Sequence, residues 1–165
     1  MLLGSTKAEL DRLLGKPVMG RNVIGLPGEK AWSYARGDFE ILVGFLNDVA
    51  RYNAVKRRRG PNTALTSSEL GGALALNAPS SLWTIETPDV PLKKAPEPRR
   101  KTKTESLPAS SFTYVEKDPK VKDKVLREIH GWMPGGKPYA FFYLPTLDGQ
   151  PPLLVSEWGV HQTLG

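Results

Sequence analysis

The chain has 165 residues, of which 39% are hydrophobic and 24% charged, and its formal charge is +6. This length suffices for one large domain or two small ones around a real core. The lack of cysteine excludes disulfides, thiolate metal ligands and cysteine nucleophiles. No apolar run approaches the roughly 20 residues that a membrane span needs, while the positive charge permits a polyanionic partner.

The first three residues, Met-Leu-Leu, are too short for the apolar core of a signal peptide. We therefore expect a cytoplasmic protein if no targeting segment was trimmed. If one was removed, a periplasmic or secreted protein is expected.

The first helix is predicted to begin at Thr6. A threonine followed three residues later by Glu9 forms a capping box, in which each side chain binds a backbone N–H of the first turn. Leu10, Leu13 and Leu14 follow at the spacing of one helix face and should pack on a sheet. The Gly-Lys-Pro sequence after them predicts the end of the helix.

A three-stranded meander is predicted next, with strands over 31–35, 39–46 and 49–56. Large apolar residues alternate with smaller or polar ones in the middle strand, which is typical of a sheet with one buried face. The Asn-Asp pair at 47–48 suits a tight turn. The segment 16–30 has no sustained period and is predicted to be a loop.

The capping box recurs 60 positions later, at Thr66 and Glu69. In both places a proline closes the helix, and a tryptophan, Trp32 or Trp83, then opens an extended run. This echo predicts an α+β fold of two helix-plus-antiparallel-sheet units, with both helices on one sheet face. The units are predicted to span 1–61 and 62–165, and their two sheets either stay separate or join into one.

The second unit should be interrupted twice. The segment 87–111 is rich in proline, lysine and arginine and poor in large apolar residues, so it is expected to be a mobile linker. Asp118-Pro119 then resembles a helix start, and apolar residues at helical spacing predict an inserted helix over 118–130. Strands are expected at 82–86 and 112–116, and a last hairpin at 139–144 and 153–158.

No catalytic constellation is visible. The two histidines, His130 and His161, lie far apart without a metal-binding spacing, and no serine stands in a nucleophile elbow. The glycine-rich run ending at Lys137 is followed by proline where a phosphate-binding loop has Ser or Thr. We therefore predict a protein that is not an enzyme and that uses no cofactor or metal.

Aromatic and basic residues supply candidates for an interface. Trp32 and Trp83 hold equivalent places in the two units and are expected in the core. The other two tryptophans should be partly exposed, as anchors of protein interfaces are. The basic residues lie on or just after the strand 49–56. The candidate interface consists of Arg51, Arg57, Arg58, Arg59, Trp132 and Trp158.

The order of helix, Leu-Gly-Lys-Pro closure, Trp-x-Tyr strand and aliphatic strand turning through Asn-Asp resembles the small α+β unit of the SmpA/OmlA outer-membrane lipoproteins. It is also similar in outline to the beta-lactamase inhibitor protein, which has two such units in tandem. The resemblance covers 6–56 and, more loosely, 66–158. It implies a protein that acts by binding other proteins, generally outside the cytoplasm.

The leading functional hypothesis is a non-enzymatic protein-binding or assembly module that uses an antiparallel sheet face. The alternative is a nucleic-acid-associated protein that uses the basic segments 56–59 and 93–103, whose affinity would fall steeply with salt.

Overall fold

Antiparallel strands dominate the computed structural model, which describes residues 2–22, 30–79, 82–86, 110–147, 153–156 and 159–162. Within these ranges there are two helices and ten strands. In chain order they are α1 (Lys7–Leu14), β1 (Met19–Asn22), β2 (Lys30–Arg36), β3 (Phe39–Leu46), β4 (Val49–Arg57), α2 (Ser67–Asn77), β5 (Thr84–Glu86), β6 (Ser110–Lys117), β7 (Val125–Met133), β8 (Tyr139–Tyr143), β9 (Leu153–Ser156) and β10 (Gly159–Gln162).

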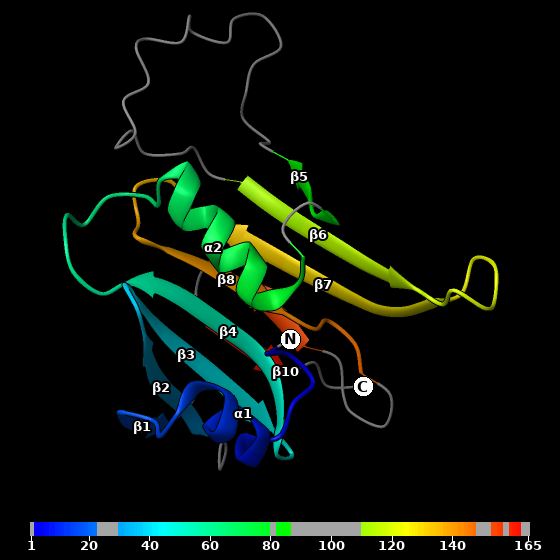
Figure 1. The fold of residues 1–165 in the computed structure, drawn as a ribbon, viewed down its shortest axis with the longest axis horizontal. Coiled ribbons are helices and arrows are strands. Elements are labelled where there is room, and N and C mark those ends of the chain that lie inside the picture. The colour runs from blue at the N-terminus through cyan, green and yellow to red at the C-terminus, as the bar shows by residue number, and fades with distance from the viewer. Residues whose placement is uncertain are drawn as a thin grey trace, which may run out of the picture.

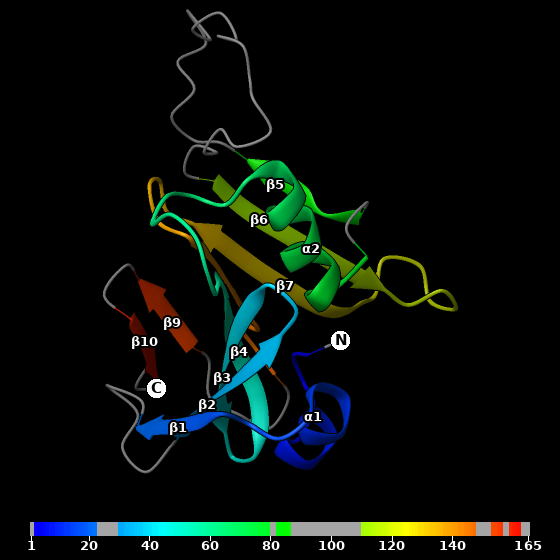
Figure 2. The same ribbon diagram turned by 60° about the vertical axis from the view of Figure 1, so that its left-hand side comes forward.

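The described strands form one eight-stranded sheet in the order β1-β2-β3-β4-β8-β7-β6-β5, and a separate two-stranded sheet of β9 and β10. Both helices lie on one side of the large sheet (Figure 1). The β9–β10 sheet lies on the opposite side, beside the strands β2 to β4 (Figure 2). The molecule therefore has three layers over one half of the large sheet.

The prediction of two helix-plus-sheet units is wrong. The large sheet is continuous, because β4 pairs with β8 from Tyr52↔Tyr143 to Lys56↔Tyr139. Sequence pattern defines which residues share a face of a strand, but not which distant strand it pairs with. The sequence also missed β1, a short edge strand in the expected loop 16–30, which pairs with β2.

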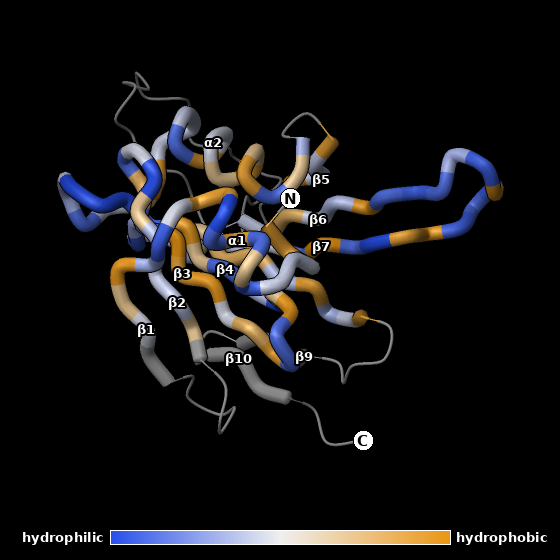
Figure 3. Tube along the Cα trace, turned by 60° about the horizontal axis from the view of Figure 1, so that its bottom comes forward, coloured by the Kyte–Doolittle hydropathy of each residue, from blue (hydrophilic) through white to orange (hydrophobic). Residues whose placement is uncertain are grey.

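The inserted helix predicted over 118–130 is also wrong, because residues 125–133 form strand β7. Asp118 does not cap a helix; its carboxylate accepts a hydrogen bond from the backbone N–H of Lys120 at 2.8 Å, within a turn. Strand pairing with β6 decided the outcome, since it aligns Ile129 with Tyr114 on the core side. The β6–β7 hairpin projects beyond the sheet and is largely hydrophilic (Figure 3).

The last hairpin was predicted with the wrong partner. β9 pairs with β10, from Leu153↔Gln162 to Ser156↔Gly159, and not with β8. The linker predicted at 87–111 lies outside the described residues except for its last two, which begin β6.

The core is filled from the helix side. Leu10 of α1 packs with Tyr34 and Ile41, while a larger cluster lies beneath α2. Leu2 and Leu3 are both fully buried, one in each cluster, so the N-terminal segment fills the space between the helices. Figure 1 shows this end of the chain between α1 and α2.

Both predicted capping boxes are confirmed, at Thr6 with Glu9 and at Thr66 with Glu69. The expected leucine stripe of α1 is only partly buried, because the side chain of Leu13 is 50% exposed. In α2, a Cβ at Gly72 would lie 3.3 Å from the ring of Phe39, so the glycine allows a close approach between α2 and β3.

Candidate functional site

Two features of the described residues could bind a partner: a row of aromatic side chains on the large sheet, and a pocket at the start of α2. The aromatic row follows from strand register. Residues of β7 and β8 that pair as Trp132↔Phe141 and His130↔Tyr143 project from the same face. That face is opposite to the helices, because the alternate residue Phe142 is buried in the core beneath α2.

The aromatic rings contact one another across the strands. The ring centroids of Tyr52 and Phe141 lie 5.4 Å apart and the rings are stacked. Those of His130 and Tyr143 lie 5.8 Å apart, and those of Phe141 and Tyr143 lie 6.3 Å apart. These separations are typical of favourable aromatic pairs, so the row holds a defined arrangement.

The face away from the helices differs between its two halves. On β2 and β4, Ala31, Ser33 and Tyr52 are buried. The β9–β10 sheet lies beside the strands β2 to β4 (Figure 2). Over β7 and β8 the outward side chains are half-buried. We call them the open aromatic face; they are His130, Trp132, Tyr139, Phe141 and Tyr143.

Two tyrosine hydroxyls of this region, those of Tyr52 and Tyr143, stay protonated at neutral pH. Burial raises the pKa of Tyr52 to about 12 and also raises the pKa of Tyr143. On the open aromatic face, Tyr143 therefore presents a neutral hydroxyl. Its charged neighbours are Lys56, which pairs with Tyr139 at one end, and Glu128, whose carboxylate lies 2.8 Å from Nε2 of His130 at the other.

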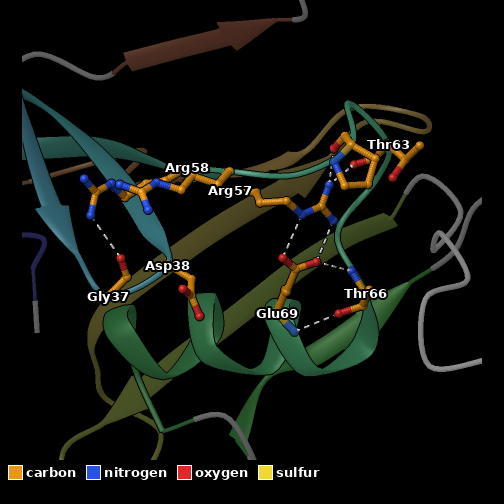
Figure 4. A pocket seen from close by; sticks show the side chains of 9 residues that line it. Gly37, Asp38, Arg57, Arg58, Thr63, Thr66 and Glu69 are labelled. Carbon is orange, nitrogen blue, oxygen red and sulfur yellow. Dashed lines mark hydrogen bonds and ion pairs between the residues drawn. The ribbon is translucent and has the colours of Figure 1, made fainter.

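The pocket has a volume of about 430 Å³ and lies where three segments meet (Figure 4). The β2–β3 turn contributes Asp38, the last residue of β4 contributes Arg57, and the segment just after β4 contributes Arg58 and Arg59. The third wall comes from the β4–α2 loop and the first turn of α2, including Glu69.

Arg57 holds this pocket together. Its guanidinium donates to both carboxylate oxygens of Glu69, at 2.8 and 2.6 Å. Its remaining N–H groups donate to the carbonyls of Pro61, Thr63 and Ala64 in the β4–α2 loop. All five N–H groups of the guanidinium are thus used.

The ion pair with Arg57 changes the pKa of Glu69. The Arg57 guanidinium, helped by the backbone N–H of Thr66, lowers the pKa of Glu69 to about 2, against an opposing effect of burial. The carboxylate is therefore ionised at neutral pH and its charge is compensated by Arg57. These two residues act as a structural clamp.

The structure does not bring the predicted interface residues to one surface. Arg51 is fully buried, and its guanidinium donates to the carbonyl of Leu144 at 3.1 Å. Arg57 is committed to the clamp, whereas Arg58 and Arg59 are exposed at the pocket. Trp132 belongs to the open aromatic face, and Trp158 lies outside the described residues.

Most residues of the open aromatic face were not predicted from the sequence. The run Tyr-Ala-Phe-Phe-Tyr at 139–143 places Tyr139, Phe141 and Tyr143 on one face by simple alternation, so the signal was present. No sequence pattern indicates that Asp38 and Glu69 line the same pocket, because their proximity depends on how α2 is placed against the sheet.

In the described ranges, no three His, Asp or Glu side chains gather as a metal site would require. Neither described helix has the length and apolar character needed to cross a membrane. Comparisons of the chain with protein-family models, curated proteins and solved structures find no match. The resemblance to the SmpA/OmlA unit stays a prediction.

Proposed function

We propose that the protein is a non-enzymatic binding or assembly module that receives a protein partner on the open aromatic face. The observation that carries the proposal is the contrast between the two halves of the same face. Tyr52 of β4 is buried, while Trp132, Phe141 and Tyr143 of β7 and β8 remain half-buried. Tryptophan and tyrosine are the residues most enriched among the energetic anchors of protein interfaces.

The geometry favours a partner with an apolar surface. The rings are pre-ordered by their mutual contacts, so little side-chain entropy is lost when they bind. The central part of the face is neutral, and Lys56 at its margin can pair with an acidic side chain of the partner. Both features agree with the usual pattern of an apolar centre and a polar rim.

Site-specific photo-crosslinking tests the proposal. A photoreactive amino acid replaces Trp132 in one version of the protein and Leu13, an equally apolar position on the helix side, in the other. We expect a discrete crosslinked product from position 132 only. Excess unmodified protein should compete for the partner and abolish the crosslinked product. The Trp132→Ala/Tyr143→Ala variant should compete at least about tenfold less well.

Mass spectrometry of the product identifies either another protein or a second copy of the chain, and both fit the proposal. Equal crosslinking from the two positions would contradict it. So would full competition by the double variant, provided that its urea unfolding midpoint is unchanged.

Single-stranded nucleic acid is the second candidate, because bases stack on aromatic side chains of an open sheet and Lys56 lies on the same face. Of the basic segment 56–59, Arg57 is already committed to the clamp, and the segment 93–103 lies outside the described residues. A labelled oligonucleotide should then bind with an affinity that falls steeply between about 50 and 200 mM salt. Binding that is absent at low salt removes this candidate.

A further inference from the structure

The pocket at the start of α2 has properties that the open aromatic face does not explain. Its volume of about 430 Å³ is in the range of small-molecule sites. Because the clamp between Arg57 and Glu69 uses every N–H of Arg57, the pocket is shaped before any ligand arrives. Such pre-organisation lowers the entropy cost of binding.

The next two arginines are differently placed. Arg58 donates one N–H to the carbonyl of Gly37 at 3.2 Å, which directs its side chain across the β2–β3 turn (Figure 4). Within the described part of the chain, the other guanidinium N–H groups of Arg58 and all guanidinium N–H groups of Arg59 have no side-chain or carbonyl partner. Two guanidinium groups with free donors at one pocket can bind several oxygens of a phosphoryl group.

Asp38 adds a negative charge to the lining of the pocket. Its carboxylate is exposed at the pocket and takes part in no ion pair among the described residues. Together with Arg58 and Arg59 it leaves one net positive charge, since the Arg57–Glu69 pair is neutral. A ligand that satisfies this lining has one anionic group and a separate hydrogen-bond donor.

We propose that the pocket binds a small phosphorylated molecule. Arg58 and Arg59 bind the phosphoryl oxygens, and Asp38 accepts a hydrogen bond from a hydroxyl or amino group elsewhere on the ligand. The site uses none of the residues of the open aromatic face, so either proposal can fail without the other.

Amide chemical shifts measured by NMR test the site with three probes: inorganic phosphate, ribose 5-phosphate and unphosphorylated ribose. We expect ribose 5-phosphate to shift amides around the pocket with a Kd of about 1 mM or below, and ribose to produce no shift. The Arg58→Ala/Arg59→Ala variant should bind ribose 5-phosphate at least about tenfold more weakly. Both residues are exposed, so its urea midpoint should stay unchanged.

Asp38→Asn separates this site from a general basic surface. Removing the carboxylate should increase the affinity for inorganic phosphate by about threefold or more, because the negative charge of Asp38 no longer repels the phosphate. The increase in affinity for ribose 5-phosphate should be smaller, because the asparagine weakens the hydrogen bond to the sugar. Unchanged affinity in the double-arginine variant would overturn the proposal, as would an equal gain for both ligands. An oligonucleotide that binds these arginines more tightly than ribose 5-phosphate would overturn it in favour of nucleic acid.

Discussion

The clamp between Arg57 and Glu69 should be a major source of stability, and Arg57→Ala removes it. The Arg57 side chain is only 8% exposed and that of Glu69 is 23% exposed. The pKa of Glu69 falls from 4.5 to about 2, which corresponds to about 3 kcal/mol before solvent screening and about 2 kcal/mol after it. The buried carbonyl of Ala64 also loses its donor, so we expect a total loss of about 2–4 kcal/mol.

Urea unfolding at pH 7 measures this loss, with Arg58→Ala as the matched control at the adjacent, exposed position. The control should change the free energy of unfolding by less than about 0.5 kcal/mol. A double-mutant cycle with Glu69→Gln should show a coupling of about 1–2 kcal/mol, since glutamine preserves the capping box. A loss below about 0.5 kcal/mol for Arg57→Ala would refute the reasoning.

The stabilisation by the Arg57–Glu69 clamp should decrease at low pH. The folded-state pKa of Glu69 is lower than its unfolded value, so the stabilisation is fully present above pH 4.5 and is lost as the pH falls towards 2. The difference in unfolding free energy between the unmodified protein and Arg57→Ala should therefore shrink over this window. A difference that stays constant from pH 7 to about pH 2 would show that the ion pair does not cause it.

Three further predictions concern the sheet and the helices that cover it. Gly44→Ala should cost about 2–3 kcal/mol, because the new Cβ would overlap a neighbouring tyrosine ring; a urea midpoint equal to that of the unmodified protein would contradict this. Asn77→Ala should cost about 2–3 kcal/mol, since the buried amide of Asn53 loses its partner at 2.7 Å, and removing both amides should cost less than the sum of the single losses. Tyr34→Phe removes a 2.7 Å hydrogen bond to Asp11 and should cost about 1 kcal/mol. Lys7 is the main cause of the lowered pKa of Asp11 and Tyr34 adds to it, so NMR titration of the variant should show that pKa rising while Lys7 still holds it below the ordinary value.

Local sequence signals predicted local structure well. Both capping boxes form as expected, because a threonine and a glutamate three residues apart bind neighbouring backbone groups regardless of the rest of the fold. The strand 39–46 has the bounds that alternation predicted. Alternation would also have placed three aromatic residues of the open aromatic face on one side of β8.

Helical spacing failed where two periods were both compatible with the residues. Val125, Leu126 and Ile129 could line one helix face, but Ile129, Gly131 and Met133 also alternate as a strand does. Pairing with β6 selected the strand, and it left Val125 and Leu126 each 50% exposed. The missing information was the presence of a partner strand, which lies outside the segment itself.

The sequence alone determined the two helix starts, the middle strands of the first sheet half and the supply of arginine and aromatic side chains. Only the tertiary structure decided that β4 pairs with β8 to make one sheet. It also decided that Arg57 forms an ion pair with Glu69, while Arg58 and Arg59 remain available at a pocket. The reason is physical. Caps and strand alternation arise from backbone geometry over a few residues, whereas partners for a strand edge or a guanidinium are chosen by competition among distant segments for burial and hydrogen bonds.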